Sequence, residues 1–278
     1  MKEKLPLVSI YIPTKNRLKL LKRAINSVIA QTYPNIELII VDDGSTDGTN
    51  EYLKTLEKES NIVVIYRDKS YGATNAKNMA ITKSKGEFLT GLDDDDFIFP
   101  DRIEHFVNFW KKLDKPIAGL FDKTLVRSKN GHYIRNEKKY VTISDLRKRN
   151  YIGNSIFAPR SHYLKAGLLD ENIPAWHDWD LWVRMSQLFG DFINIDYVTY
   201  VMDESHEFPR MTTNEERKIR KAMEIFSKKN EPFSFFERSA ILIALNEYPQ
   251  VKLNLSEMII LLLNGRFRSF FKALKKKL

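Results

Sequence analysis

Cysteine is absent from the 278 residues of this chain. Its absence excludes disulfides, thiolate metal sites and a cysteine nucleophile, and it fits a reducing compartment such as the cytoplasm. Long apolar runs are also missing: the longest, Met258 to Leu263, is far below the ~20 residues that span a bilayer. The first apolar run is rich in β-branched residues and ends at Pro13, which predicts a strand and no signal peptide. We therefore expect a cytoplasmic protein without a transmembrane segment.

Acidic residues are fewer than basic ones, 36 against 45, so the chain carries a formal net charge of +9. Such an excess favours an anionic partner: nucleic acid, a phosphorylated substrate or anionic lipid. Much of the excess lies at the C-terminus, because residues 266–278 contain six basic residues and no acid. A nucleic-acid-binding protein would spread its basic residues over a groove-facing surface among aromatics, so we expect no nucleic-acid partner.

The first part of the chain alternates between strand and helix patterns. The strand segments read "LVSIYIPT", "IELIIVDDG", "NIVVIYRD" and "GEFLTGLDDDD", and helical patterns separate them. This alternation predicts right-handed βαβ units and a mainly parallel, Rossmann-like sheet flanked by helices. A hairpin is expected around Asn130-Gly131, and the pattern is helical only from about Thr212. We therefore predict an α/β domain over residues 1–210 and a helical extension over residues 211–278.

Acidic and other polar clusters follow three of these strands directly. They are Pro13-Thr14, Asp42-Asp43 and the run Asp93 to Asp96. Single acids at strand ends are usually helix caps, but capping explains poorly four adjacent like charges between apolar segments. Hard divalent cations such as Mg²⁺ or Mn²⁺ take carboxylate oxygens and leave positions open for substrate phosphates. The run therefore predicts a metal and phosphate site at the carboxyl edge of the sheet.

Four segments of the chain resemble the family-2 inverting glycosyltransferases, nucleotide-sugar enzymes with a GT-A fold. They occur in the family's order over roughly residues 5–210 and read "VSIYIPTKNR", "QTYPNIELIIVDDGSTDGT", "GATNAKNMAITKSKGEFLTGLDDDD" and "HDWDLWVR". The resemblance implies an enzyme dependent on Mn²⁺ or Mg²⁺ that moves a hexosyl or N-acetylhexosaminyl group from a UDP-sugar. The implied acceptor is a hydroxyl of a glycan or lipid-linked glycan in bacterial surface polysaccharide synthesis, such as that of O-antigen, capsule or lipooligosaccharide.

The resemblance also implies roles for single residues. Asp95 would hold the metal, with His206 joining it from a closing loop, and Asp178 would be the general base. Asp96 would lie behind the metal ligands, and Arg210 would touch the diphosphate. Asp43, with Asp42 beside it, would recognise the nucleobase. Asp93 would lie near the ribose, and Asp94 would reach the donor sugar. The implied nucleotide-sugar contacts are Pro13, Thr14, Arg17, Asp42, Asp43, Lys77, Asn78, Asp93 and Asp94.

Two positions depart from the family's pattern, and two tryptophans are left open. Lys77 stands where the family usually has arginine, and it keeps the charge but loses the two-pronged guanidinium. His177 replaces the usual glutamate before Asp178. Trp176 and Trp179 are expected either to form an acceptor platform, since sugar rings stack on aromatic faces, or to belong to the core.

The C-terminal segment predicts an amphipathic basic helix. Its apolar stripe consists of Phe267, Phe270, Phe271, Leu274 and Leu278, and the basic residues lie largely off that stripe. We expect it to lie on an anionic membrane surface, which would place the enzyme on the inner face of the cell membrane. The alternatives are packing on the domain itself or against a second subunit, and the oligomeric state stays open.

Two other enzyme or binding classes are less favoured by the residues. A sugar nucleotidyltransferase would show a glycine-rich phosphate loop after the first strand, and "IPTKNRLKLL" has no glycine. A nucleotide-sugar-binding module without catalysis is disfavoured because Asp95 and Asp178 are both present. The sequence leaves the donor sugar, the acceptor and the linkage undetermined.

Overall fold

The computed structural model describes residues 5–207 and 215–277. Its centre is a sheet whose main path runs in the order β3-β2-β1-β4-β9-β6-β10-β5, with β7 added to β6 and β8 to β10. The bounds of the ten strands are β1 (Val8–Thr14), β2 (Ile36–Asp42), β3 (Ile62–Tyr66), β4 (Phe88–Gly91), β5 (Phe97–Ile98), β6 (Gly119–Ser128), β7 (Gly131–Arg135), β8 (Tyr140–Val141), β9 (Phe157–Pro159) and β10 (Phe192–Asp203).

The first four strands form the parallel half that the sequence predicts. Strand β1 pairs in parallel with β2 and β4, and β2 pairs in parallel with β3. The helices between them are α1 (Leu18–Ile29), α2 (Thr49–Leu56) and α3 (Ala73–Lys83). All seven residues of both β1 and β2 are buried, as expected for parallel strands covered on both faces.

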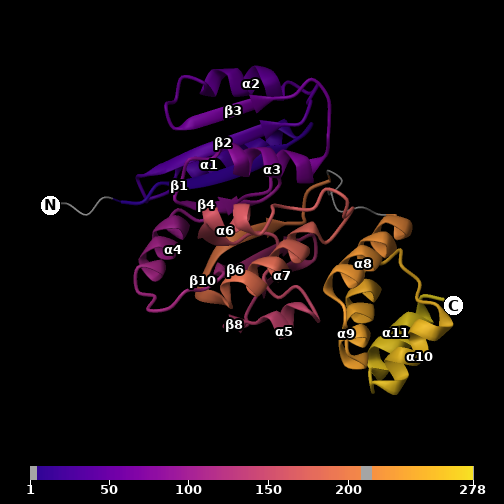
Figure 1. Cartoon of the computed structure of the whole chain (residues 1–278). Helices are drawn as coiled ribbons and strands as arrows, with labels where there is room; N and C mark the ends of the chain where they lie inside the picture. The colour runs from indigo at the N-terminus through magenta and orange to yellow at the C-terminus, as the bar shows by residue number, and fades with distance from the viewer. Residues whose placement is uncertain (1–4, 208–214, 278) are drawn as a thin grey trace.

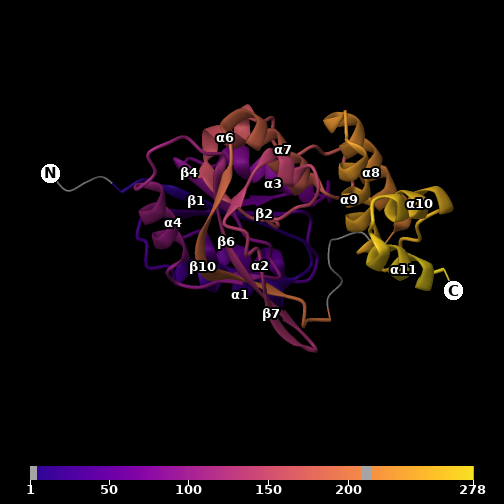
Figure 2. The same ribbon diagram turned by 90° about the horizontal axis from the view of Figure 1, so that it is seen from below.

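The second half of the sheet is mixed, although most of the paired residues of the whole sheet lie in parallel pairs. Strand β9 pairs antiparallel with both β4 and β6, and β10 runs parallel to β6 but antiparallel to β5 and β8. The hairpin expected at Asn130-Gly131 is confirmed as β6 and β7, and it projects beyond the sheet in Figure 2.

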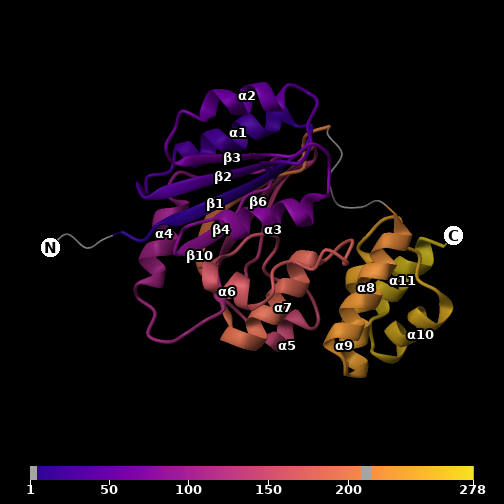
Figure 3. The ribbon, with the colours of Figure 1, turned by 45° about the horizontal axis from the view of Figure 1, so that its top comes forward.

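Two apolar layers cover the sheet, one on each face. Helices α1, α2 and α4 (Arg102–Trp110) cover one face, while α3, α5 (Ile143–Leu146), α6 (Arg160–Lys165) and α7 (His177–Phe189) cover the other (Figure 3). Successive residues of a strand serve opposite layers, since Ile10 packs under α1 whereas Tyr11 faces α3. The sheet therefore holds its strand ends rigidly between two packed cores.

The last four helices gather beside α7 (Figure 1). They are α8 (Glu216–Asn230), α9 (Phe235–Asn246), α10 (Leu255–Leu263) and α11 (Phe267–Lys275). Phe226 of α8 and Ile241 of α9 belong to the same apolar cluster as Trp179 and Trp182 of α7, so the extension shares a core with the sheet domain. None of the helices in residues 5–207 and 215–277 has both the length and the apolar character needed to cross a bilayer.

Candidate active site

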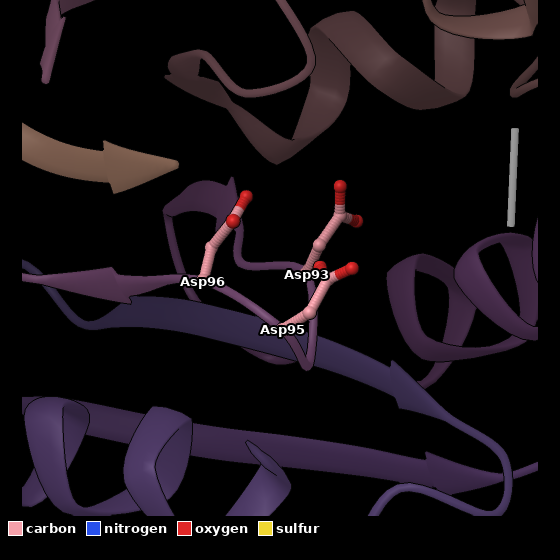
Figure 4. Close-up of side chains that lie close together, drawn as sticks. All are labelled: Asp93, Asp95 and Asp96. Carbon is pink, nitrogen blue, oxygen red and sulfur yellow. The ribbon is translucent and has the colours of Figure 1, made fainter. Parts of the chain in front are cut away.

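The candidate site lies beyond the carboxyl ends of β1 and β4. The chain runs outwards from β1 through β2 and β3 and then returns to the other side of β1 as β4. Ligands of open α/β sheets bind beyond the strand ends at such a reversal. The turn Asp93–Asp96 follows β4 directly at this place, and Figure 4 shows Asp93, Asp95 and Asp96 rising from it to one side of the sheet.

Asp94 belongs to the same turn but not to the group of three carboxylates that could share a metal ion. Its side chain accepts hydrogen bonds from the Thr14 hydroxyl at 2.8 Å and from the Arg17 guanidinium at 2.9 Å. Asp94 is fully buried, and burial raises its pKa to about 6 in spite of the neighbouring Arg17. A contact between Asp94 and the donor sugar stays a prediction, and in this structure the carboxylate is engaged by Thr14 and Arg17. Asp94 ties the acidic turn to the end of β1, together with Thr14 and Arg17.

Asp93, Asp95 and Asp96 could together hold a metal ion. Each offers a carboxylate oxygen, and these oxygens lie within 4.8 Å of one another. Carboxylate oxygens are the donors that Mg²⁺ and Mn²⁺ prefer, so the residues present fit such an ion. The carboxylate of Asp96 also accepts hydrogen bonds from the Tyr200 hydroxyl at 2.7 Å and from the Asp203 amide at 2.9 Å. Burial and the charges of Asp95 and Asp93 raise the pKa of Asp96 well above its usual value.

His206 lies next to this cluster. Its Nε2 atom is 3.5 Å from Oδ2 of Asp95, although 111 positions separate the two residues in the chain. Asp95 also accepts a hydrogen bond from Arg17 at 2.9 Å, so a guanidinium and an imidazole both face this carboxylate. The fold therefore brings His206 to the acidic turn, and its role as a metal ligand stays a prediction. Arg210, expected to touch the diphosphate, lies outside the described residues.

Lys77 links the acidic turn to the start of α7. Its Nζ lies 3.3 Å from Oδ1 of Asp93 and 3.4 Å from Oδ1 of Asp178, and its side chain is only 5% exposed. Burial alone would lower the pKa of Lys77, but the two carboxylates outweigh it and hold that pKa above its ordinary value. Lys77 is therefore a permanent cation between two carboxylates that come from different elements.

Asp178 stands at the first turn of α7, and its side chain is 16% exposed. The N-terminal end of a helix favours a carboxylate because the backbone N–H groups there carry partial positive charge. His177 lies beside it, with Nε2 3.4 Å from Oδ2 of Asp178. Burial lowers the pKa of His177, so the imidazole is held towards its neutral form at the position where the family usually has glutamate.

Two further residues complete the surroundings of Asp93. Asn154 donates a hydrogen bond from Nδ2 to Oδ2 of Asp93, and Tyr11 of β1 lies buried close to both Asp93 and Asp178. The Asn154 bond and Lys77 lower the pKa of Asp93, although burial works in the opposite direction. The sequence prediction missed both residues. Tyr11 occurs within an ordinary strand pattern, and Asn154 lies in a loop whose place beside β4 depends on the tertiary fold.

Asp42 and Asp43 end strand β2 and are both buried. Asp43 accepts hydrogen bonds from Arg67, the Ser70 hydroxyl and the amides of Tyr71 and Gly72. Burial alone would raise the pKa of Asp43, but these four donors lower it and keep the carboxylate ionised. Asp43 thus anchors the loop between β3 and α3 at the end of the sheet where a nucleobase is expected.

Two expected contacts take other partners in the structure. Asn78 accepts a hydrogen bond from the Leu169 amide and donates one to the Glu171 carboxylate, so it holds the loop before α7 in place. Trp179 is 3% exposed and donates from its indole to the carbonyl of Leu146. It therefore belongs to the core, which is one of the two alternatives that the sequence leaves open for Trp179. Trp176 is half-buried and donates to the hydroxyl of Tyr248 in the helical extension.

Comparison with known proteins supplies independent evidence on the family. The family model described as Glycosyl transferase family 2 matches residues 9–168. An uncharacterized glycosyltransferase of Rickettsia typhi is 33% identical over 198 residues, which cover 67% of this chain but only 61% of that relative. A relative in Escherichia coli K12, named WcaA as a colanic acid biosynthesis glycosyl transferase, is 32% identical over 84% of this chain and 88% of its own length.

Solved structures resemble this chain in fold. Residues 1–349 of TarS from S. aureus, in complex with UDP-GlcNAc, match with a TM-score of 0.69 at 17% identity, covering 95% of this chain and 81% of that one. The mannosyltransferase PcManGT from Pyrobaculum calidifontis, in complex with GDP-Man and Mn²⁺, matches with a TM-score of 0.60 at 17% identity, covering 98% and 86%. At this identity the likeness establishes the fold alone, which is the GT-A fold that the sequence predicts.

Proposed function

Because the chain belongs to glycosyl transferase family 2, we propose that it transfers a sugar from a UDP-sugar to a hydroxyl of a glycan acceptor, with inversion at the anomeric carbon. The sugar is a hexosyl or N-acetylhexosaminyl group, and the acceptor is a glycan or lipid-linked glycan of a bacterial surface polysaccharide. The naming of WcaA for colanic acid biosynthesis and the binding of UDP-GlcNAc by TarS support these substrate classes. The catalytic unit is residues 1–210, with residues 211–278 as the extension.

One observation carries this proposal. Asp93 and Asp178 lie 85 positions apart in the chain, yet both approach the same buried Lys77 Nζ, at 3.3 and 3.4 Å. A carboxylate cluster suited to a metal and a diphosphate thus faces a carboxylate that has no place in that cluster. Single displacement needs a carboxylate apart from the metal and diphosphate, because the general base must act on the side of the anomeric carbon opposite the leaving group.

The chemical step divides between the two sides of the site. The Asp178 carboxylate takes the proton of the acceptor hydroxyl while the oxygen of that hydroxyl forms a bond to the anomeric carbon. The bond from that carbon to the diphosphate oxygen breaks in the same step, and the electron pair leaves with UDP. Inversion follows because attack and departure occur on opposite faces. Lys77 fixes the carboxylate of Asp178 relative to that of Asp93.

Asp95 and His206 would hold Mn²⁺ or Mg²⁺ beside the diphosphate, and the carboxylates of Asp93 and Asp96 lie close enough to Asp95 to reach the same ion. When bound, the ion supplies positive charge that offsets the charge developing on the leaving diphosphate. The nucleobase would lie at the end of β2, beside Asp43 and the loop that Asp43 anchors, and the ribose would lie by Asp93. The presence of Mn²⁺ in the complex of PcManGT supports the choice of metal.

Replacement of Asp178 by asparagine tests this function most sharply. Asp178→Asn keeps the size of the side chain and removes the base, so transfer should fall by about 10²–10⁴-fold. Binding of UDP should change less than about threefold, because the base does not contact the nucleotide in this scheme. Asp101→Asn replaces an exposed carboxylate directly before α4, and this matched control should keep full activity. Near-full turnover of the Asp178→Asn enzyme would refute the assignment of the base.

A further inference from the structure

Helices α10 and α11 carry a row of exposed apolar side chains at every fourth position. The row crosses the turn at Gly265, where a positive φ of 68° lets the chain pass from one helix to the next. We call it the apolar row. Its members and their exposed fractions are Leu255 (69%), Ile259 (45%), Leu263 (71%), Phe267 (59%) and Phe271 (56%).

The apolar row is not an unfinished core, because other residues of the same helices already pack inwards. Met258, Leu261 and Ala273 are buried in a cluster with residues of α8 and α9, and Phe270 and Leu274 pack against that cluster. The stripe that the sequence predicts for the tail therefore divides in two. Phe270 and Leu274 join the protein interior, while Phe267 and Phe271 stay exposed.

The charge around the second half of the apolar row is of one sign. Arg268, Lys272 and Lys275 are exposed on α11, and residues 266–277 contain no acid. Lys276 is different, since its Nζ donates to the carbonyls of Asn246 and Tyr248 at the end of α9. Lys276 thus stabilises the end of a helix, and the other basic residues remain as an exposed cationic border to the apolar row.

We propose that the apolar row docks on a lipid surface that carries anionic headgroups. Exposed Leu, Ile and Phe side chains gain free energy by entering the boundary between headgroups and acyl chains, and lysines and arginines near the surface are attracted by anionic lipids. A second copy of this chain fits the surface poorly. A two-fold contact would bring the same acid-free segment of each copy together, and the like charges would repel.

Docking on a lipid surface rests on the proposed function in one respect: it would bring the enzyme to the surface at which a lipid-linked acceptor is presented. The docking surface itself belongs to the extension, and none of its residues contacts the acidic turn or Asp178. Loss of docking therefore leaves the nucleotide site unchanged. A titration of UDP in the absence of lipid reports the nucleotide site separately from the docking surface.

Co-sedimentation of the full chain with vesicles tests the proposal. Vesicles of phosphatidylcholine alone are compared with vesicles that also contain phosphatidylglycerol, at low and high salt. We expect binding to the anionic vesicles only, weakened by salt because screening reduces the attraction of headgroups for lysine and arginine. Lys272→Ala/Lys275→Ala should weaken binding by about tenfold or more. Phe267→Ser/Phe271→Ser should weaken it as strongly, by removing the inserted side chains.

The controls keep the outcome interpretable. Lys19→Ala/Lys54→Ala removes the same charge from exposed positions on α1 and α2 and should leave vesicle binding unchanged. All variants replace exposed side chains, and thermal melting checks that each is folded. No binding of the unaltered chain to anionic vesicles, or equal binding by all variants, would overturn the proposal. A dimer of the unaltered chain that Phe267→Ser/Phe271→Ser dissociates would assign the apolar row to a second copy and overturn it too.

Discussion

Lys77 is the buried cation on which the arrangement of the two sides of the site depends. It lies within 3.4 Å of both Asp93 and Asp178, and each of these carboxylates is less than a quarter exposed. Lysine at this position reaches both acids with a single Nζ atom. An arginine, usual in the family, would present a planar fork of N–H donors in place of the single Nζ atom.

Replacing Lys77 with methionine should impair both turnover and stability. Lys77→Met keeps the length of the side chain but leaves two partly buried carboxylates facing each other without a cation. Removal of one partner of a buried charge pair costs about 3–5 kcal/mol of the free energy of unfolding. We expect the apparent melting temperature to drop and kcat to fall by about 10²-fold or more. Measured kcat, KM and thermal melting of the variant check this.

Lys77→Arg is the matched control for that variant, because it keeps the charge and changes only the shape of the donor group. It should recover a larger part of both kcat and stability than Lys77→Met. A methionine variant with unchanged melting and turnover would show that Lys77 has no part in holding Asp93 and Asp178. The role assigned to it here would then be withdrawn.

The sequence indicates where the acids lie but not where each of them points. Four adjacent aspartates at the end of a strand predict a cation site. The structure brings the carboxylates of Asp93, Asp95 and Asp96 close enough together to share one metal ion. Asp94 does not belong to this group of carboxylates, because Thr14 and Arg17 hold its side chain by hydrogen bonds. Both lie at or just after the end of β1, about 80 positions earlier in the chain. Side-chain directions within a turn depend on such distant partners, and local sequence does not contain them.

At the level of helices and strands, the contact between α5 and α9 is the clearest polar link between the sheet domain and the extension. Arg147, next to α5, donates from Nε to Glu237 of α9 at 2.7 Å, and Glu237 also forms a capping box with Ser234. The hydrogen bond from Arg147 is the main cause of the lowered pKa of Glu237, which falls to about 2. The ionised form of Glu237 therefore stabilises the folded chain.

Stability should depend on pH through this carboxylate. Because the pKa of Glu237 falls on folding from its ordinary 4.5 to about 2, its contribution is complete above the ordinary value and is lost as the pH falls towards about 2. Glu237→Gln should lower the free energy of unfolding by about 1.5–3 kcal/mol at neutral pH, and the difference should shrink below about pH 4.5. Urea unfolding at several pH values measures it.

Glu224→Gln, at an exposed position on α8, serves as the comparison for that experiment and should leave the free energy of unfolding almost unchanged. If the Glu237→Gln variant lost the same stability at every pH, ionisation of Glu237 would have no part in the effect. Packing of the side chain would then be the better explanation of the contact between α5 and α9.

Long elements are predicted by the sequence, whereas the shortest strands are not. Strand β1, helix α1 and helix α7 are seven, 12 and 13 residues long, which is enough for the sequence to carry a recognisable pattern. Strands β5 and β9 have only two and three residues. A run of that length carries no period, so their antiparallel pairing with β10 and β4 depends on tertiary contacts alone.

Across the whole molecule, the extension supports the element that carries the candidate base. Trp179 of α7 contacts Phe226 of α8, with ring centroids 4.6 Å apart, and Trp176 contacts the same ring at 5.9 Å. Residues that the sequence leaves open between an acceptor platform and core thus join two parts of the chain. Local sequence could not decide between these alternatives, because the covering ring lies more than 40 positions away.

The central claim is that the acidic turn binds a nucleotide diphosphate through a divalent cation. Calorimetric titration of UDP into the purified protein, with Mn²⁺ and with EDTA, beside an Asp95→Asn variant, tests it most directly. We expect binding with Mn²⁺ that weakens at least about tenfold with EDTA and equally in the variant, since both remove the charge that offsets the diphosphate. Absence of UDP binding under every condition, or binding indifferent to both metal and Asp95, would contradict the account.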